Sequence, residues 1–330
     1  MSILVTGGAG YIGSHMVLAL CDAGEDVVVL DDLSTGVRAN VDQRARLVLG
    51  DVSDQALVLR LIAEHGIRAV VHFAAKIVVP DSVSDPLDYY LANTTKTRAL
   101  LAAVTGAHVP HFVFSSTAAV YGNVSQEPVG EYTPAIPVSP YGASKLMSEW
   151  MLRDSAAAYG LNYVALRYFN VAGADPQGRS GQSTPRATHL IKVACEAATG
   201  KRSGMQVFGT KYPTRDGTCI RDYIHVSDLV AAHMDALRYL KSGGGNTVLN
   251  CGYGAGYSVL DVIDMVKRVS GNEFPIALAP ARAGDPAVIV ARADRIRETL
   301  GWQPKFDNLE TIVRHALAWE RKLPAKSAAA

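Results

Sequence analysis

Residues 3–13 read ILVTGGAGYIG, and this short segment contains the most informative pattern of the chain. A brief apolar run leads directly into glycines at positions 7, 10 and 13, and an apolar helix is expected over residues 11–23. Glycines at this spacing let the backbone pass close to a pyrophosphate at the amino end of a helix. A second apolar strand is expected at residues 26–30, which is the order of elements in a dinucleotide-binding unit. A tight turn without a ligand is the alternative, and this context disfavours it.

The rest of the first half repeats this alternation of short strand-like runs and longer helix-like stretches. Such alternation is typical of βαβ units around a parallel sheet that is buried on both faces. The expected strands are residues 3–6, 26–30, 46–49, 69–73, 111–115 and 163–168. We therefore expect an α/β fold with a Rossmann-type, doubly wound parallel sheet over residues 1–171. A smaller C-terminal α/β domain for the substrate follows over residues 172–330, and the chain is free to cross between the two.

Two helices of the first half have clear start signals. Asp85 and Ser139 each precede a proline, the arrangement of an N-cap residue followed by the first helical residue. These helices are expected to end near Gly106 and Gly160. In the more broken second half, helices are expected at residues 188–199, 226–240 and 259–269.

The composition excludes several classes of protein and partner. The 330 residues are 48% hydrophobic and 19% charged, which is typical of a globular chain with a sizeable core. The formal net charge of +1 offers no general attraction to nucleic acid or to anionic lipid. The four cysteines stand singly, without zinc-ligand or disulfide spacing, so no metal site is expected. No apolar run is long enough to cross a membrane and no signal peptide is recognised, so we expect a cytoplasmic protein.

Two carboxylates follow expected strands where a dinucleotide would lie. Asp31 follows the second strand, where a carboxylate accepts hydrogen bonds from the adenosine ribose and repels a 2′-phosphate. NAD is therefore favoured over NADP, although aspartate is also a common turn residue. Asp51 and Val52 follow the third strand and are placed to meet the adenine, but Asp51 could equally be a solvated loop carboxylate.

A tyrosine and a lysine four positions apart follow the fifth strand. Tyr141 and Lys145 would share one helix face, where the ammonium lowers the pKa of the phenol by favouring its charged form. A phenol of pKa ~10 is a poor base at neutral pH, so this lowering would make Tyr141 a usable one. The spacing alone also occurs in surface pairs, and its place after a dinucleotide loop is what makes it specific. The Thr117 hydroxyl could bind the reacting oxygen, although a threonine at a strand end is more often structural.

These segments together resemble a known family. The matching blocks are GGAGYIGSH from residue 7, Asp31, HFAA at 72–75, FSSTAAVYG at 114–122, SPYGASK at 139–145 and RYFNVAGA at 167–174. They resemble the extended short-chain dehydrogenase/reductase family. With GTCIRDYIHVSDL at 217–229 and ARAGDPA at 281–287, the order and spacing closely resemble the UDP-glucose 4-epimerases, also called UDP-galactose 4-epimerases. The resemblance covers the chain up to about residue 320.

The resemblance implies a role for each matching residue. It makes Tyr141 the base, Lys145 its electrostatic partner and a nicotinamide-ribose ligand, and Thr117 the hydroxyl on the sugar's 4-oxygen. The cofactor-contacting positions are Gly7, Gly10, Tyr11, Ile12, Gly13, Asp31, Asp51, Val52, Phe73, Ala74, Asn93, Ser115, Tyr141, Lys145 and Tyr168. The substrate-binding positions are Thr117, Tyr141, Asn170, His189, Leu190, Gln206, Phe208, Arg221, Arg282 and Asp285. Arg221 and Arg282 are suited to a pyrophosphate, and Phe208 could face uracil.

The implied activity is the reversible interconversion of UDP-glucose and UDP-galactose by transient oxidation at carbon 4 with tightly bound NAD. The implied assembly is a homodimer paired through the helices that begin near Pro86 and Pro140. Another UDP-sugar, either an N-acetylhexosamine or a pentose form, is an alternative substrate. A non-catalytic NAD-binding sensor is the alternative from another class. Dehydration is disfavoured because Ala118 and Ala119 follow Thr117, where dehydratases of the family have Asp-Glu.

Three positions depart from the pattern of many relatives. Thr117 stands where many have serine, which keeps the hydroxyl and adds a methyl group. Ile77 stands where many have lysine, and Lys76 lies one place earlier, so no phosphate contact is assigned there. Ile289 occupies the position whose size governs whether an N-acetylated sugar fits, and its intermediate bulk leaves that question open.

Overall fold

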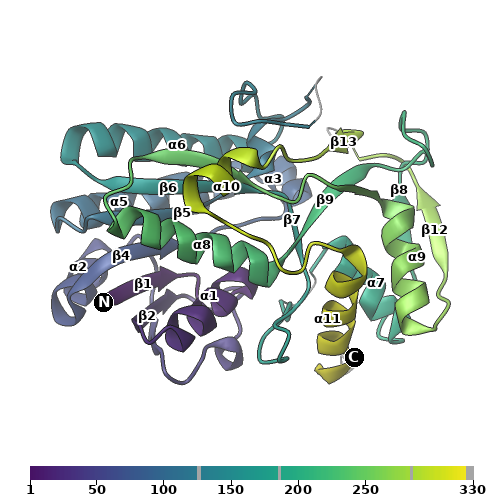
Figure 1. The fold of residues 1–330 in the computed structure, drawn as a ribbon, viewed down its shortest axis with the longest axis horizontal. Helices are drawn as coiled ribbons and strands as arrows, with labels where there is room; N and C mark the ends of the chain where they lie inside the picture. The colour runs from purple at the N-terminus through teal and green to yellow at the C-terminus, as the bar shows by residue number, and fades with distance from the viewer. Residues whose placement is uncertain (125–127, 185–186, 283–284, 325–330) are drawn as a thin grey trace.

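The computed structural model describes residues 1–124, 128–184, 187–282 and 285–324, and its centre is one seven-stranded parallel sheet (Figure 1). The strand order is β10-β6-β5-β4-β1-β2-β3. The strands are β1 (Ser2–Thr6), β2 (Asp26–Asp31), β3 (Arg46–Leu49), β4 (Ile67–His72), β5 (His111–Thr117), β6 (Asn162–Tyr168) and β10 (Thr247–Cys251). All six expected strands are present, with ends that differ by no more than two residues. The expected Rossmann-type α/β fold is therefore confirmed.

Helices cover both faces of this sheet. One face carries α1 (Tyr11–Asp22) and α8 (Val226–Lys241), which pack against each other. The other face carries α2 (Gln55–His65), α5 (Lys96–Gly106) and α6 (Pro140–Tyr159). Successive residues of β1 point to opposite faces, so Ile3 and Val5 enter the first core and Leu4 the second. This double burial explains why the strands read as continuous apolar runs.

The predicted N-cap residues of the two long helices form the expected hydrogen bonds. The Asp85 and Ser139 side chains accept hydrogen bonds from the backbone N–H groups of Asp88 and Gly142. The helix from Pro86 consists of consecutive segments: α4 (Pro86–Tyr89), a π-helical stretch η2 (Tyr90–Thr95) and α5. Gly160 ends α6 in the left-handed conformation with φ +72°. The expected ends at Gly106 and Gly160 are therefore confirmed.

Segments far apart in sequence build the sheet, because β10 lies in the second half of the chain. It pairs in parallel with β6, from Thr247 against Val164 to Cys251 against Tyr168. The preceding helix α8 covers the same sheet (Figure 1). The chain thus crosses back beyond residue 171, a possibility that the sequence left open, although β10 itself was not among the expected strands.

A second, smaller group of elements extends from the carboxyl edge of the main sheet. Its strands are β7 (Asn170–Ala172), β8 (Met205–Phe208), β9 (Ile220–His225), β11 (Gly256–Ser258), β12 (Ile276–Ala279) and β13 (Val288–Ile289). Its helices α7 (Leu190–Ala198), α9 (Val259–Ser270) and α11 (Leu309–Lys322) pack on one another around a core of their own (Figure 1). Because β7 begins two residues after β6 ends, this group starts where the catalytic side of the sheet is expected.

The remaining short elements connect these two parts. They are η1 (Arg38–Asn40), α3 (Val79–Ser84), η3 (Ala118–Val120) and α10 (Asp294–Leu300). The four cysteines are buried and unpaired. Among the described residues, no helix has the length and apolarity to cross a membrane. In the same part of the chain, no cluster of three or more His, Cys, Asp or Glu residues is arranged to hold a metal ion.

Candidate active site

The glycine-rich loop after β1 is tightly packed at the amino end of α1. Gly7 has φ +71°, and a Cβ there would lie 2.6 Å from the Ala74 backbone nitrogen. A Cβ on Gly13 would lie 2.1 Å from the Gly7 carbonyl oxygen, so neither position tolerates a side chain. No side chain caps α1 at Gly10, which leaves the first N–H groups of the helix free for an anion. This geometry fits the pyrophosphate of a dinucleotide.

Asp31 at the end of β2 is bound to this loop. Its two carboxylate oxygens accept hydrogen bonds from the backbone N–H groups of Ala9 at 2.9 Å and Leu33 at 2.8 Å. Burial raises the pKa of Asp31, although these two bonds lower it in part. Each oxygen retains a lone pair that a ribose hydroxyl can use. The carboxylate is therefore oriented for the role expected from its place in the sequence.

The other predicted cofactor positions follow the carboxyl ends of neighbouring strands. Asp51 forms an ion pair with Lys96 and accepts a hydrogen bond from the Ser53 N–H at 2.8 Å, so it is a partnered loop carboxylate. Val52 is buried in the core beside α2. Phe73 and Ala74 lie against Gly7, as the loop requires. Ile12 lies on α1 and packs against the core.

Two further polar side chains of the cofactor set are held by the protein. Asn93 lies in the π-helical stretch. Its Oδ1 atom accepts from the Lys76 N–H at 2.8 Å, and its Nδ2 atom donates to the Lys76 carbonyl oxygen at 2.9 Å. The charge of Lys76 is paired with Asp88, which agrees with its having no assigned phosphate contact. The Tyr11 hydroxyl donates to the Gly173 carbonyl oxygen at 2.7 Å and so joins the loop to the end of β7.

Thr117, Tyr141 and Lys145 come together where β5 ends and α6 begins. The Thr117 hydroxyl accepts from the Ala119 N–H at 3.1 Å and lies close enough to the Tyr141 phenol to lower its pKa, and all three side chains are buried. The Lys145 ammonium donates to the Ser115 carbonyl oxygen at 2.9 Å. A Cβ on Gly142 would lie only 2.4 Å from the Ala119 carbonyl oxygen, so the glycine lets α6 approach the Thr117 turn this closely. The sequence thus identified three residues that the fold brings to one point.

Burial dominates the electrostatics of this group. Burial raises the pKa of Tyr141 to about 12, and the hydrogen bond with Thr117 lowers it only in part. Burial also lowers the pKa of Lys145 to about 7, and the Glu149 carboxylate raises it in part. Desolvation of the phenolate therefore keeps the Tyr141 pKa high in the chain alone, and the lowering expected beside Lys145 stays a prediction.

Ser115 and Tyr168, two predicted cofactor contacts, lie beside this group. Their hydroxyls are hydrogen-bonded to each other, and burial raises the pKa of Tyr168. The rings of Phe73 and Tyr168 both lie near the buried imidazole of His233, at 4.9 Å and 6.4 Å between centroids. The Nε2 atom of His233 is buried and finds no hydrogen-bond partner in the described part of the chain.

The residues predicted to grip the nucleotide form a second group around β8, β9 and the segment before β13. Arg221 on β9 forms an ion pair with Asp285 at 2.5 Å. The Arg282 guanidinium lies over the Phe208 ring, 3.9 Å from its centroid. Gln206 is exposed on the same face of β8 as Phe208. Two cations and a partly buried aromatic ring therefore lie together, a combination suited to a pyrophosphate and a base.

Asn170 and Ile289 place this second group next to the first. Asn170 is exposed, pairs with Tyr223 in the β7–β9 ladder, and follows Tyr168 by two positions. Ile289 is 7% exposed and pairs with Arg221 in the β13–β9 ladder. Because β7 continues the path of β6, the β9 residues lie beyond the strand ends that carry the catalytic group.

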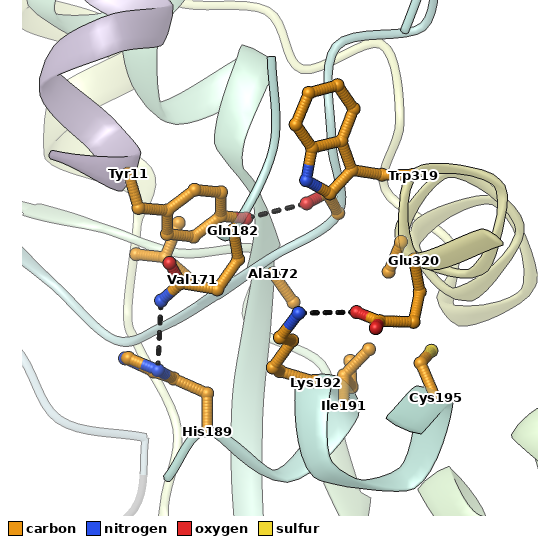
Figure 2. A pocket seen from close by; sticks show the side chains of 12 residues that line it. Tyr11, Val171, Ala172, Gln182, His189, Ile191, Lys192, Cys195, Trp319 and Glu320 are labelled. Atoms are coloured by element: carbon orange, nitrogen blue, oxygen red, sulfur yellow. Dashed lines mark hydrogen bonds and ion pairs between the residues drawn. The ribbon is translucent and has the colours of Figure 1, made fainter. Parts of the chain in front are cut away.

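His189 and Leu190 lie at the start of α7, beside a small cavity shown in Figure 2. The His189 imidazole faces the Gln182 amide at 3.3 Å, and Tyr11 closes the same side. The cavity measures about 20 Å³, room for one water molecule and far too little for a hexose. A wider depression of about 660 Å³ between residues 128–134 and α10 contains none of the predicted site residues.

Some side chains at the site were not anticipated from the sequence. Glu149 lies one turn beyond Lys145 on α6 and is bound to Arg167, the residue before Tyr168. Its spacing of four from Lys145 was available in the sequence, but its partner is distant along the chain. Tyr212 lies near Arg221, Arg282 and Asp285, and its buried hydroxyl has no hydrogen-bond partner among the residues that the structure describes. No local pattern marks a residue of this kind.

Comparison with known proteins agrees with this geometry. The model of the NAD dependent epimerase/dehydratase family matches residues 3–252. A UDP-glucose 4-epimerase from Azospirillum brasilense is 57% identical over 321 residues, which cover 97% of this chain and 92% of that protein. The chain belongs to the UDP-glucose 4-epimerases of the NAD-dependent epimerase/dehydratase family.

Solved structures of UDP-glucose 4-epimerases have the same fold. The Brucella ovis enzyme, in complex with NAD, has a TM-score of 0.93 and 44% identity, covering 96% of this chain and 97% of that one. The Bifidobacterium longum enzyme, in complex with NAD⁺ and UDP, has a TM-score of 0.94 and 36% identity, covering 98% of both chains. The resemblance to UDP-glucose 4-epimerases is therefore confirmed over the whole chain.

Proposed function

We propose that this protein interconverts UDP-glucose and UDP-galactose by transient oxidation at carbon 4 of the sugar, and that it retains NAD through each cycle. The observation that carries the proposal is that the buried side chains of Thr117, Tyr141 and Lys145 come together at the carboxyl edge of a dinucleotide-binding sheet. The 57% identity with a UDP-glucose 4-epimerase supports the same activity.

NAD fits the glycine loop, and its residues have defined tasks. The free N–H groups at the start of α1 receive the pyrophosphate, and Asp31 receives the ribose hydroxyls. Bound NAD supplies reversible two-electron redox chemistry at carbon 4. Because Asp31 repels a 2′-phosphate, the site prefers NAD over NADP. The predicted contacts at Asn93, Ser115 and Tyr168 orient the nicotinamide end.

Tyr141 acts on the sugar 4-hydroxyl as the base. Its phenolate removes the hydroxyl proton as the carbon is oxidised and returns it when the carbon is reduced from the opposite face. The raised pKa of Tyr141 in the chain alone means that binding must favour the phenolate, and the Lys145 ammonium and the cationic nicotinamide ring both do so. Thr117 holds the 4-oxygen by its hydroxyl.

Unequal binding of the two halves of the substrate makes the inversion possible. Arg221, Arg282 and Phe208 grip the UDP, while the hexose must turn over between oxidation and reduction. The 4-keto sugar therefore has to be held loosely, which explains why the recognisable binding residues gather on the nucleotide side. In keeping with the disfavoured dehydration, the turn after Thr117 consists of Ala118 and Ala119 and offers no acid.

We also propose a homodimer formed through α3, α4 and α6. The described part of this surface exposes Leu87 by 77%, Val83 by 64%, Leu91 by 52% and Trp150 by 48%. Exposed apolar side chains gathered on neighbouring helices are typical of a subunit interface. Light scattering of the purified protein should give twice the mass of 35.1 kDa. A single-chain mass at micromolar concentration would reject the dimer.

Two further proposals concern organisation and location. Residues 1–171, completed by α8 and β10, form the NAD-binding part, and the rest of residues 172–330 form the UDP-sugar part. We place the protein in the cytoplasm, which the four free buried cysteines support because disulfides are rare there. Limited proteolysis and fractionation of cells test these two statements separately.

The experiment that tests the activity is incubation of the purified protein with UDP-galactose and no added NAD. Chromatographic separation of UDP-glucose from UDP-galactose should show conversion to an equilibrium mixture. No conversion, even after NAD is supplied, would reject the hexose activity and favour another UDP-sugar or the non-catalytic sensor. UDP-N-acetylgalactosamine in a parallel reaction tests whether Ile289 leaves space for an N-acetyl group.

A further inference from the structure

Glu149 lies directly behind the catalytic group and contacts two strands. Its Oε1 atom accepts hydrogen bonds from the Ser116 hydroxyl at 2.5 Å and from Nε of Arg167 at 2.9 Å. Its Oε2 atom accepts from Nη2 of Arg167 at 2.6 Å. The glutamate is 5% exposed and the arginine 7% exposed, so this is a buried bidentate ion pair.

The neighbours of these contacts are the proposed catalytic residues. Ser116 lies between Ser115, whose carbonyl oxygen accepts from Lys145, and Thr117, whose hydroxyl lies close to the Tyr141 phenol. Arg167 immediately precedes Tyr168, which is hydrogen-bonded to Ser115. One carboxylate on α6 therefore fixes the ends of β5 and β6 relative to the helix that carries Tyr141 and Lys145.

Glu149 also supplies a negative charge that acts on Lys145. On α6, Glu149 favours the charged form of Lys145, while the phenol of Tyr141 is neutral in the chain alone. From β4, His72 contributes no charge, because burial lowers its pKa to about 3. From β5, the ring of Phe114 lies 4.9 Å from the ammonium. From β6, Arg167 directs its guanidinium to Glu149.

Arg167 is held from its other side as well. Its guanidinium lies 4.9 Å from the centroid of the Tyr121 ring, and the Tyr121 hydroxyl donates to Oδ1 of Asn250 on β10 at 2.7 Å. The arginine is thus fixed independently of Glu149. As a cation with donors only, it offers the Lys145 ammonium no hydrogen-bond acceptor.

We propose that Glu149 is a positioning residue of the reaction: it presents a negative charge to Lys145 from one helical turn away, and it holds the ends of β5 and β6 around the sugar 4-oxygen. This inference rests on the proposed function, because the ammonium is the group that favours the Tyr141 phenolate. A structural ion pair would stabilise the fold equally well at any distance from Lys145. Glu149 bonds Ser116, which lies between Ser115 and Thr117. A change at Glu149 is therefore expected to move the strand end beside Lys145 and Tyr141.

The test variant removes the negative charge of Glu149 and keeps the shape of its side chain. In Glu149→Gln, the ammonium of Lys145 loses its favourable neighbour and releases its proton at lower pH. The alkaline limb of kcat against pH should therefore move down by about one pH unit, the scale of one nearby charge in a buried site. Glu149→Asp, which keeps the charge, should restore most of the parent profile.

A second readout does not depend on turnover. Protein labelled with ¹³Cε lysine, purified as it exists with its cofactor, reports each lysine titration by NMR, and Lys145→Arg identifies the Lys145 resonance. In Glu149→Gln this resonance should titrate at lower pH than in the parent. An unchanged Lys145 titration in a folded variant would overturn the proposal.

Two further variants separate positioning from stability. Glu149→Gln leaves Arg167 buried and unpaired, so Glu149→Gln with Arg167→Gln provides a neutral pair that can fold. It should shift the limb in the same direction but by less, because a positive charge is removed together with the negative one. Glu320→Gln is the matched control, because Glu320 is another buried carboxylate, paired with Lys192 and Lys201 far from Lys145. It should lose stability with no displacement of the alkaline limb. An inactive parent protein would reject the proposed function, and the NMR titration would still test Glu149.

Discussion

The Lys145 ammonium donates to the Ser115 carbonyl oxygen at 2.9 Å, and the Ser115 hydroxyl is bonded to that of Tyr168. One serine therefore links the proposed electrostatic partner of the base to a predicted cofactor contact. Because the ammonium is held by the backbone of β5, its position does not depend on a bound ligand. The catalytic group is pre-organised on the ends of β5, β6 and α6, which are rigid parts of the fold.

Removing the phenol oxygen should separate catalysis from binding. In Tyr141→Phe we expect kcat to fall by about 10²–10⁴, because the proton of the 4-hydroxyl loses its acceptor. Binding of UDP and retention of NAD should be close to those of the parent, since neither needs the hydroxyl. Turnover of UDP-galactose and calorimetry with UDP measure the two quantities. Normal turnover by this variant would remove Tyr141 from the mechanism.

Thr117 provides two variants that separate the role of its hydroxyl from that of its methyl group. Thr117→Ser keeps the hydroxyl and should retain most of the activity, whereas Thr117→Val keeps the shape and removes the hydroxyl from beside Tyr141 and the sugar oxygen. We expect the valine variant to lose roughly 10–100-fold in kcat/KM, the scale of one lost hydrogen bond in a buried polar site. Equal activities of the two variants would show that the hydroxyl has no role in the reaction.

Gly142 tests the close approach of α6 to the Thr117 turn. In Gly142→Ala the new Cβ would lie 2.4 Å from the Ala119 carbonyl oxygen, so the helix or the turn must move. We expect a loss of stability of about 1–3 kcal/mol and a fall in kcat, because Tyr141 is the adjacent residue. Gly106→Ala on α5 is the control, since a Cβ there meets no atom within 4 Å. The control should be neutral or slightly stabilising in urea unfolding. If the two variants unfold at the same urea concentration, the packing argument fails.

A substitution at Arg221 tests the proposed binding of the UDP pyrophosphate. In Arg221→Lys the bidentate geometry is lost while the charge stays, so KM for UDP-galactose should rise roughly 10-fold with a smaller effect on kcat. The control is Arg314→Lys on α11, an exposed arginine paired with Glu310, which should leave both constants unchanged. An unaffected KM in Arg221→Lys would place the pyrophosphate elsewhere.

Features that depend on neighbouring residues were predictable from the sequence, whereas features that depend on distant residues were not. The expected strands and the Asp85 and Ser139 caps depend on neighbours in sequence, and they were predicted to within a few residues. The joining of β10 to β6 depends on a pairing over about 80 residues, such as Thr247 with Val164, and no local pattern specifies it. The same holds for Glu149 with Arg167. The raised pKa of Tyr141 also needed the structure, because burial is a property of the whole fold.

Lys145 should make the stability of the protein depend on pH. Burial lowers its pKa from 10.5 to about 7, so between pH 7 and 10.5 the unfolded chain binds a proton that the folded chain does not. Stability therefore rises with pH across this window, and below pH 7 the full cost of burying the ammonium, roughly 5 kcal/mol before its hydrogen bond is counted, is present. Lys145→Met removes this cost together with the proton.

The measurement is the free energy of unfolding in urea for the parent and Lys145→Met at pH 6, 7, 8 and 9. The contributions of the other titrating groups to the free energy of unfolding cancel in the difference between the two proteins. We expect Lys145→Met to be more stable at pH 6 by a margin that narrows steadily toward pH 9, while its kcat falls. A constant margin would mean that Lys145 has the same pKa in both states, and the burial argument for the catalytic group would be wrong.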